Sequence, residues 1–248
     1  MRIAVAGGTG LVGGLTVRAL ERAGHDPVVI SRSTGANTIT GDGLDEALQG
    51  VDAVVDATST SELEADATRA FFGTSTKNLL AAEERAGVGH HVVLSIVGVD
   101  LVPDNGHYAG KIRQEEVAEA GPVPVTILRA TQFFEFAEQV IGWTRDGDTI
   151  TLAPLLLQPV AAADVADALA DAAARTPQGR APDLAGPETQ DFVDMARRIL
   201  AARGDSTARL VPSWQNGMFG VEMAGEVLLP GPDARLAPTT FGAWLTAS

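Results

Sequence analysis

A glycine-rich turn near the start of the chain limits the folds that are open to it. Residues 7–13 read GGTGLVG and directly follow a short apolar run over residues 2–6. The turn can be written as G-x-G-x-x-G from Gly8 or as G-x-x-G-x-x-G from Gly7. A strand, such a turn and a helix with apolar residues at helical spacing together form the opening of a dinucleotide-binding βαβ unit.

The positions of this turn have separate physical roles in holding a pyrophosphate. The first glycines allow a tight turn, Gly10 lets the backbone approach the phosphates, and Gly13 lets the helix pack closely on the strand. The pyrophosphate then lies against the free N–H groups at the positive end of the helix that begins near Leu11. The predicted cofactor contacts in the turn are Gly7, Thr9, Gly10, Leu11, Val12 and Gly13.

Apolar runs alternate with amphipathic segments over the first half of the chain. The pattern predicts strands over residues 2–6, 27–30, 38–40, 53–57, 91–94 and 125–128, and helices over residues 11–23, 44–48, 64–86 and 108–120. Continuous apolar strands between helices are typical of a parallel sheet that is covered on both faces. With right-handed crossovers, this gives an α/β fold of the Rossmann type, with a doubly wound parallel sheet.

After Arg129 the pattern becomes less regular. It predicts helices over residues 131–143, 162–174 and 191–202 and short strands over residues 149–152 and 158–160, with prolines throughout the rest. We therefore expect one NAD(P)-binding domain over residues 1–248. Its Rossmann core occupies residues 1–150, and residues 151–248 form mostly a small substrate-side lobe and capping elements.

Composition and charge exclude several other classes of protein. A net charge of −14 argues against broad neutralisation of nucleic-acid phosphates, and the chain has no cysteine for disulfides or thiolate metal sites. We expect no metal site, because adjacent strand residues such as His90 and His91 point to opposite faces. No apolar stretch reaches about eighteen residues and no leader pattern opens the chain, so a cytoplasmic protein with no membrane partner is expected.

The end of the second predicted strand indicates which dinucleotide is bound. NAD-binding proteins usually place Asp or Glu there to bond the ribose 2′-hydroxyl, whereas this chain has Ser31, Arg32 and Ser33. A guanidinium and two hydroxyls suit the 2′-phosphate of NADP(H). The sequence therefore predicts a preference for NADP(H) over NAD(H).

Two further segments are candidates for cofactor contact. Asp42 follows the weak third strand, where it is equally consistent with a contact near the adenine and with a turn or helix cap. Ala57, Thr58 and Ser59 follow the fourth strand, and their small side chains would let the chain pass beside the ribose and pyrophosphate. Loops at the carboxyl ends of parallel strands are where ligands bind in this architecture.

The glycine turn and the Ser-Arg-Ser segment, together with residues 91–100 (HVVLSIVGVD) and 128–134 (LRATQFF), resemble the atypical short-chain dehydrogenase/reductases. More narrowly, they resemble the NmrA-like NAD(P)-binding group. The resemblance implies that Ser95 occupies the position of the family's serine or threonine, where it either bonds a substrate oxygen or lines the cofactor. It also implies that Gln132 and Phe133 lie against the nicotinamide and the substrate pocket.

The wider superfamily reduces carbonyls with a tyrosine four residues before a lysine on one helix, and this sequence departs from that pattern. Four residues before Lys111 stands His107, and Tyr108 is three residues before it. Either spacing leaves the two side chains within about 60° of each other around the helix. Lys111 is predicted to contact the cofactor, and the proton donor is left open between Tyr108, His107 and neither. The polar run at residues 114–116 is interpreted as solvated surface.

Two functions of different classes follow. The first is an NADP(H)-dependent reductase that acts on a small carbonyl, quinone or conjugated substrate as a monomer or homodimer. The second is a non-catalytic NADP(H)-binding redox sensor of the NmrA type, which the departure at His107 favours.

Overall fold

The computed structural model describes residues 1–215 and 219–247, which divide into two compact units. The first unit comprises Met1–Arg129 and Val165–Pro182, and the second comprises Ala130–Asp164 and Asp183–Ser248. The two units interleave along the sequence, whereas the sequence pattern predicts a single division, at residue 150.

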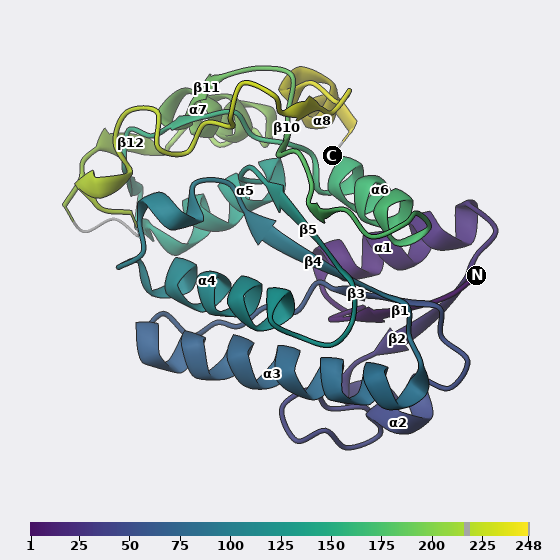
Figure 1. The fold of residues 1–248 in the computed structure, drawn as a ribbon. Coiled ribbons are helices and arrows are strands. Elements are labelled where there is room, and N and C mark those ends of the chain that lie inside the picture. Colours follow the sequence, from purple (N-terminus) through teal and green to yellow (C-terminus); the bar gives the residue numbers. More distant parts are fainter. Residues whose placement is uncertain (216–218, 248) are drawn as a thin grey trace. The chain divides into compact units, whose positions relative to one another are not determined.

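A parallel sheet forms the centre of the first unit (Figure 1). Its strands run in the order β5-β4-β3-β1-β2, and a short strand β9 pairs with β5. The pairs β1–β2, β1–β3, β3–β4 and β5–β9 are parallel. The strands are β1 (Arg2–Ala6), β2 (Asp26–Ile30), β3 (Ala53–Asp56), β4 (His90–Ile96), β5 (Val125–Ala130) and β9 (Gly179–Arg180). This order confirms the predicted Rossmann-type sheet.

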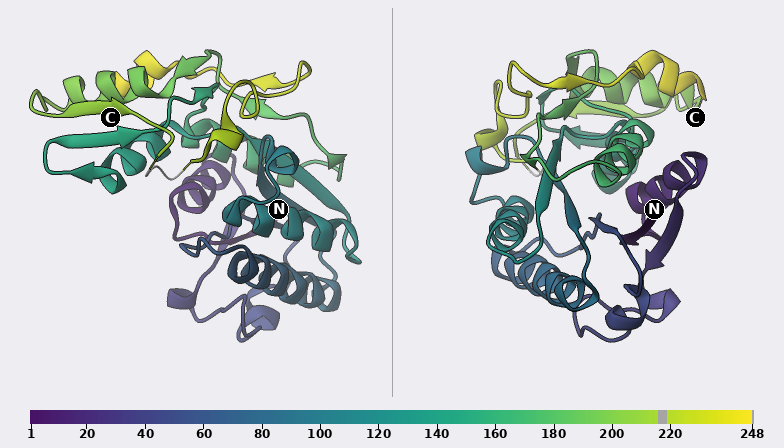
Figure 2. Two further views of the ribbon diagram at one scale, coloured as in Figure 1. Left: turned by 90° about the vertical axis from the view of Figure 1, so that its left-hand side faces the viewer. Right: turned by 45° about the vertical axis from the view of Figure 1, so that its right-hand side comes forward.

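Helices cover both faces of this sheet, as Figures 1 and 2 show. On one face lie α1 (Leu11–Arg22) and the part of α6 (Ala162–Ala173) from residue 165 onward, joined by an ion pair of 2.6 Å between Arg22 and Asp167. On the other lie α3 (Ala65–Ala86) and α4 (Gly106–Glu119). These two pack closely, because a Cβ on Gly110 would lie 2.6 Å from the ring of Phe72. Burial on both faces explains why the strands are continuously apolar.

The predicted strand over residues 38–40 is wrong, because this segment forms a turn. The side chain of Asn37 accepts a hydrogen bond from the backbone N–H of Ile39 at 2.9 Å, and Gly41 and Gly43 adopt positive φ angles of 82° and 71°. An Asx turn followed by two left-handed residues curls the chain instead of extending it. The short helix α2 (Leu44–Ala47) follows directly.

The second unit has its own aromatic core. Phe134 lies 5.4 Å from Phe241 and 5.5 Å from Trp244, between ring centroids, and the Trp244 indole donates to Glu135 at 3.1 Å. Its helices are α5 (Phe134–Trp143), α7 (Phe192–Ala202) and α8 (Phe241–Ala247). Its strand pairings are β6 (Arg145–Asp146) and β12 (Arg209–Pro212) with β7 (Thr149–Leu152), β8 (Leu156–Leu157) with β11 (Gln190–Asp191), and β10 (Leu184–Ala185) with β13 (Arg235–Leu236).

Two predicted elements of this second unit are shifted. The strand expected over residues 158–160 is only an isolated bridge between Val160 and Phe133, and the nearest strand is β8. The helix expected from Thr131 begins at Phe134 instead. The Thr131 hydroxyl donates to the carbonyl of Gln158 at 2.7 Å, which holds this segment beside the neighbouring loop rather than in a helical turn.

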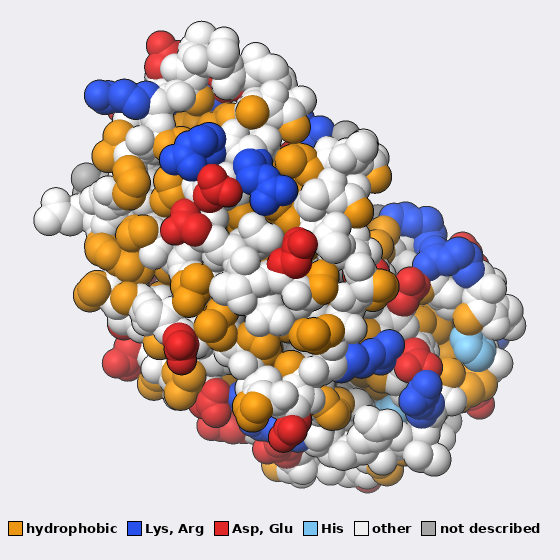
Figure 3. Space-filling model, turned by 90° about the horizontal axis from the view of Figure 1, so that it is seen from above, with side chains coloured by type: hydrophobic (Ala, Val, Ile, Leu, Met, Phe, Trp, Pro, Cys, Tyr) orange, Lys and Arg blue, Asp and Glu red, His pale blue; other side chains and the backbone are white. Residues whose placement is uncertain are grey.

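Within residues 1–215 and 219–247, no helix is long and apolar enough to cross a membrane. On the face shown in Figure 3, basic side chains are interspersed with acidic ones.

Candidate cofactor-binding site

The glycine turn lies between the ends of three strands of the first unit. Gly7 has a φ of 75°, its backbone N–H donates to the carbonyl of Ile30 at 3.1 Å, and the Gly10 N–H closes the turn onto Gly7 at 2.9 Å. A Cβ on Gly7 would lie 2.6 Å from the carbonyl oxygen of Ala57. The tight turn expected from the sequence is present, and it brings the ends of β1, β2 and β3 together.

Helix α1 begins at this turn with free backbone donors. Gly10 is its N-cap residue, no side chain caps the first turn, and the first turn contains no acidic residue. The N–H groups that open a helix have no partner within it, so they remain available to an anion at the positive end of the helix dipole. A Cβ on Gly10 would meet only the Gly7 carbonyl, at 3.3 Å, which leaves open space above the turn for a phosphate.

The Ser-Arg-Ser segment forms a single 3₁₀ turn, η1 (Arg32–Thr34), directly after β2. The Ser31 and Ser33 hydroxyls are 2.9 Å apart, and the Thr34 hydroxyl donates to the carbonyl of Val29 at 2.9 Å. The turn is therefore anchored by its own hydroxyls. Arg32 is exposed and makes no ion pair with any described residue, so its guanidinium is free beside the glycine turn.

Asp42 lies in the loop between β2 and α2 rather than at the end of a strand. Its carboxylate accepts a hydrogen bond from the Thr40 hydroxyl at 2.6 Å, and its carbonyl accepts one from Asn37 at 2.8 Å. These are the contacts of a turn aspartate, one of its two sequence interpretations. Contact between Asp42 and an adenine stays a prediction.

The loop after β3 is held by a buried carboxylate. Thr58 donates to Asp56 Oδ1 through its backbone N–H at 3.0 Å and through its hydroxyl at 2.6 Å. Ala57 continues the β3 ladder by donating to the carbonyl of Ala6 at 3.0 Å. Two of the three predicted contacts in this loop, Ala57 and Thr58, are therefore held in place beside the glycine turn, and Ser59 follows them directly.

The Lys111 side chain contacts β4 near its carboxyl end, at the residue before Ser95. The Lys111 ammonium donates to the carbonyl of Leu94 at 2.5 Å and lies 4.7 Å from the centroid of the Phe72 ring. Ser95 is 1% exposed, and its hydroxyl has no hydrogen-bond partner among the described residues. Because buried hydroxyls are normally bonded, this unpartnered group indicates a missing polar partner. Burial lowers the pKa of Lys111 to about 8, although the charges of Asp56 and Glu115 oppose this shift.

His107 and Tyr108 lie in the first turn of α4. The side chain of the N-cap residue Asn105 accepts the backbone N–H groups of both residues, at 3.1 and 3.2 Å. The His107 ring meets Phe72 edge-on at 5.6 Å, and burial together with the charge of Lys111 lowers the pKa of His107 to about 4. At neutral pH, His107 is therefore an uncharged imidazole. Tyr108 is buried, and which of these residues donates a proton stays open.

Gln132 and Phe133 lie in the second unit, in the extended segment before α5. Val160 donates to the Gln132 carbonyl at 2.9 Å, and Phe133 is the N-cap residue of α5. Both polar atoms of the Gln132 amide are buried without a partner among the described residues. Their predicted contact with the nicotinamide stays a prediction.

The sequence interpretation missed two buried polar residues of α4. The polar sequence of residues 114–116 predicts solvated surface, but Gln114 is 0% exposed and Glu115 is 4% exposed. Gln114 bonds both Lys111 and Asp56, and Glu115 accepts from Arg129 at 2.8 and 2.9 Å. That interpretation is wrong for both residues, because buried partners satisfy their polar atoms. The signal available was the spacing of three and four residues from Lys111, which puts both side chains on its face of the helix.

The two adjacent histidines bond different partners, as the strand geometry requires. His90 Nε2 lies 2.8 Å from the Thr126 hydroxyl, whereas His91 Nδ1 lies 2.8 Å from a carboxylate oxygen of Glu83. In the part of the chain that the structure describes, no group of three His, Asp or Glu side chains could hold a metal ion.

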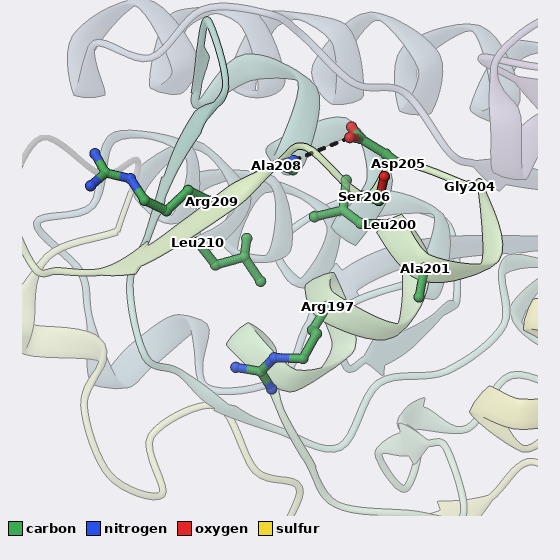
Figure 4. Close-up of a pocket in the computed structure, with 9 residues that line it drawn as sticks. All are labelled: Arg197, Leu200, Ala201, Gly204, Asp205, Ser206, Ala208, Arg209 and Leu210. Atoms are coloured by element: carbon green, nitrogen blue, oxygen red, sulfur yellow. Dashed lines mark hydrogen bonds between the residues drawn. The ribbon is translucent and has the colours of Figure 1, made fainter.

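One open pocket of about 630 Å³ lies in the second unit, between α7 and β12 (Figure 4). Its lining includes Arg197 and Leu200 from α7, Arg209 and Leu210 from β12, and Asp205 from the connecting turn. The Asp205 carboxylate is already engaged, because it pairs with Arg145 and accepts the Ala208 N–H at 3.2 Å. None of the predicted site residues lines this pocket.

Comparison with known proteins places this geometry in a family. A model of the NAD(P)H-binding family matches residues 7–176, which is more than half of the chain. No curated protein matches the sequence. An NADPH-dependent quinone oxidoreductase from Escherichia coli is 16% identical with a TM-score of 0.70, and the match covers 99% of this chain and 98% of that one.

Two further solved structures show the same fold. A short-chain dehydrogenase/reductase superfamily protein from Agrobacterium tumefaciens, with bound NAD, is 18% identical with a TM-score of 0.69, over 100% of this chain and 95% of that one. A dTDP-4-dehydrorhamnose reductase from Clostridium acetobutylicum is 15% identical with a TM-score of 0.69, over 86% and 84% of the two chains.

The residues of the first unit fit a dinucleotide on the structure's own observations. A phosphate can approach the backbone at Gly10 and accept hydrogen bonds from the uncapped start of α1. The Arg32 guanidinium and the Ser95 hydroxyl, which have no partner among the described residues, can bond further polar groups of the cofactor or substrate. The match of the family model begins at Gly7, the first residue of the turn. The chain therefore belongs to the NAD(P)H-binding family and has the Rossmann-type fold of the short-chain dehydrogenase/reductases.

Proposed function

We propose that this protein is an NADP(H)-dependent oxidoreductase that reduces a small carbonyl, quinone or conjugated substrate. The observation that carries the proposal is the free Arg32 guanidinium directly after β2, beside the glycine turn and the uncapped start of α1. A pyrophosphate on the α1 amides would bring the adenosine ribose to the end of β2.

The preference for NADP(H) rests on what surrounds the expected 2′-phosphate. The η1 turn offers one guanidinium and the Ser31 and Ser33 hydroxyls, and it contains no carboxylate. A guanidinium binds a phosphate through two parallel charge-assisted hydrogen bonds. The carboxylate that usually bonds the 2′-hydroxyl of NAD is missing from this position.

The reduced nicotinamide, when bound, supplies the hydride. The chain's own part is to hold the cofactor and orient a substrate oxygen. We assign the orienting role to the Ser95 hydroxyl, because Ser95 is the last residue but one of β4 and its hydroxyl has no partner among the described residues. Lys111 is assigned to the cofactor, since its ammonium has three N–H groups and two of them bond Leu94 and Gln114.

The function is tested by calorimetric titration of NADPH and NADH, followed by NADPH oxidation with a panel of quinones, aldehydes and enones. We expect tighter binding of NADPH than of NADH, and turnover with at least one class. The Ser95→Ala variant should bind NADPH normally and lose most of that turnover. Absence of binding of either dinucleotide at low salt would overturn the proposal.

A second candidate function is a non-catalytic NADP(H) sensor of the NmrA type. The observation that favours it is His107, which replaces the tyrosine of the superfamily and is uncharged at neutral pH. A sensor should bind NADP⁺ and NADPH with clearly different affinities and turn over no substrate of the panel. The same calorimeter and the same panel therefore separate the two functions.

A further inference from the structure

Three buried polar side chains form a continuous hydrogen-bonded series in the first unit. The Lys111 ammonium donates to Gln114 Oε1, and Gln114 Nε2 donates to Asp56 Oδ2 at 2.8 Å. Lys111 is 4% exposed, and the other two residues are fully buried. We call Asp56, Gln114 and Lys111 the buried triad.

Asp56 links the triad to the loop beside the glycine turn. Its Oδ1 accepts both the backbone N–H and the hydroxyl of Thr58, and its Oδ2 also accepts the Thr76 hydroxyl at 3.3 Å. One carboxylate therefore fixes the loop after β3, a side chain of α3 and, through Gln114, the lysine of α4. A displacement of any one of these partners would therefore alter the hydrogen bonds that Asp56 accepts from the others.

The chemistry of the three groups explains why a glutamine lies between the two charges. An ammonium can only donate hydrogen bonds and a carboxylate can only accept them. The group that joins them must accept at one end and donate at the other, and a neutral amide does so in one orientation only. Buried charges are costly unless their hydrogen bonds are satisfied, so this orientation is strongly favoured.

We propose that Gln114 and Asp56 are positioning residues. They hold the Lys111 ammonium near the carboxyl end of β4, at a fixed position relative to the loop after β3 that packs on the glycine turn. The proposal rests on the proposed function only where it assigns Lys111 to the cofactor. The hydrogen-bond partners of Gln114 among the described residues are Lys111 and Asp56, and of these two only Lys111 is a predicted cofactor contact, so the influence of Gln114 on binding would pass through the lysine.

The charged and titratable groups around Lys111 come from β3 and α4, and α3 adds an aromatic ring. Asp56 ends β3, while His107 and Glu115 lie on α4 with the lysine, and the ring of Phe72 faces it from α3. Gln114 is neutral and hydrogen-bonds both charged members of the triad, so Gln114→Met removes these bonds without changing the formal charge near the ammonium. This makes position 114 the informative one for an experiment.

The chain contains only two lysines, which gives a direct readout. In protein labelled with ¹³C-lysine, NMR should show one signal from Lys111 and one from Lys77, an exposed residue of α3 that serves as an internal control. We would titrate wild type, Gln114→Met and Gln114→Glu without cofactor. Met has a similar length but neither accepts nor donates strongly, whereas Glu keeps an acceptor oxygen.

We expect the titration midpoint of Lys111 to fall in Gln114→Met but not in Gln114→Glu. Losing the acceptor should lower the Lys111 titration midpoint in Gln114→Met by about one pH unit. Gln114→Glu should keep it at or above the wild-type midpoint. A merely structural role would loosen the site in both variants, admit water, and move both midpoints upward toward that of Lys77. That upward shift, or no shift, in Gln114→Met would overturn the proposal. Asp56→Asn, which removes the charge but keeps the shape, should also lower the midpoint.

NADPH titration separates this proposal from the proposed function. Gln114→Met should weaken NADPH binding by about tenfold, while the control Lys77→Met should leave it unchanged. If wild type binds no dinucleotide, the proposed function fails, yet the NMR result still decides the triad. If wild type binds NADPH and Gln114→Met binds it equally well, the positioning role is wrong and the proposed function stands.

Discussion

A Cβ atom on Gly13 would lie 2.2 Å from the carbonyl oxygen of Gly7, far inside van der Waals contact. Helix α1 therefore rests directly on the turn that precedes it, and the obstructing atom is backbone, which cannot rotate away. We expect Gly13→Ala to lower the free energy of unfolding by about 1–3 kcal/mol through overpacking. Urea unfolding would measure this loss, and wild-type stability would contradict the close packing.

Gly10→Ala should separate binding from stability. The new Cβ would meet only the Gly7 carbonyl, at 3.3 Å, so the fold should persist. It would, however, occupy the space where the backbone approaches a pyrophosphate, so we expect a loss of NADPH affinity of at least about tenfold.

The matched control for Gly10 is Gly14→Ala, one turn further along α1. Its Cβ would lie 3.5 Å from the Gly8 carbonyl, which is ordinary contact. This variant should keep its affinity and gain up to about 1 kcal/mol, because alanine favours a helix interior. Equal affinity of the two variants for NADPH in calorimetry would rule out the proposed approach at Gly10.

Arg32→Ala should discriminate between the two dinucleotides. If the guanidinium binds the 2′-phosphate, its removal should weaken NADPH binding by about 10–100-fold and leave NADH binding nearly unchanged. Arg69→Ala, which removes an exposed arginine of α3, is the control and should change neither. Equal losses for NADPH and NADH would show that Arg32 does not read the extra phosphate.

Sequence pattern predicted the first unit closely, because its strands are continuous apolar runs and its helices end at clear signals. The strand predicted over residues 2–6 coincides with β1, and α3 ends at Ala86 before Gly87, which adopts a φ of 73°. The strand predicted over residues 38–40 failed because turn residues on both sides outweigh a single apolar residue, Ile39. Ile39 is itself 39% exposed, so the segment gains too little from burial to fix an extended conformation.

The tight turn after β1 could be predicted, because its backbone geometry requires glycine: Gly7 adopts a φ of 75°, and a Cβ on Gly13 would lie 2.2 Å from the Gly7 carbonyl oxygen. Phosphate binding by this turn and by Arg32 stays a prediction. Gln114 was missed because its environment comes from tertiary contacts. On α4, the residues Lys111, Gln114, Glu115 and Ala118 are all buried at the spacing of a core-facing helix stripe. Three of these four are polar, so a search for apolar periodicity cannot find the stripe. Only the facing groups, such as Asp56, show why polar side chains are satisfied there.

The buried pair of His91 and Glu83 should make stability depend on pH. Burial alone lowers the pKa of His91, but the charge and hydrogen bond of Glu83 outweigh it and raise the pKa above its usual 6.5. The stabilisation from the pair is therefore fully present below about pH 6.5 and is lost as the pH rises through the folded-state pKa.

Glu83→Gln tests this dependence. Removing one partner of a buried pair should cost about 3 kcal/mol at pH 6, and the cost should shrink by pH 9. Urea unfolding of both proteins at several pH values gives the difference directly. The exposed neighbour Glu84 supplies the control, since Glu84→Gln should shift stability little and equally at each pH. A cost for Glu83→Gln that stays constant with pH would contradict the pairing.

His107 should act in the opposite direction. Its folded-state pKa of about 4 lies below the unfolded value of 6.5, so both states are uncharged above pH 7. As the pH falls from 7 toward 4, only the unfolded state gains a proton at this site, and the folded protein loses up to about 3 kcal/mol of stability. His107→Phe keeps an edge-on ring against Phe72 and removes this protonation. We therefore expect the free energy of unfolding of the variant, measured with urea, to rise relative to that of wild type as the pH falls from 7 to 4. If the free energies of unfolding of the two proteins instead change equally with pH, the pKa of His107 in the folded protein is near its usual value. His107 would then again be a candidate proton donor at neutral pH.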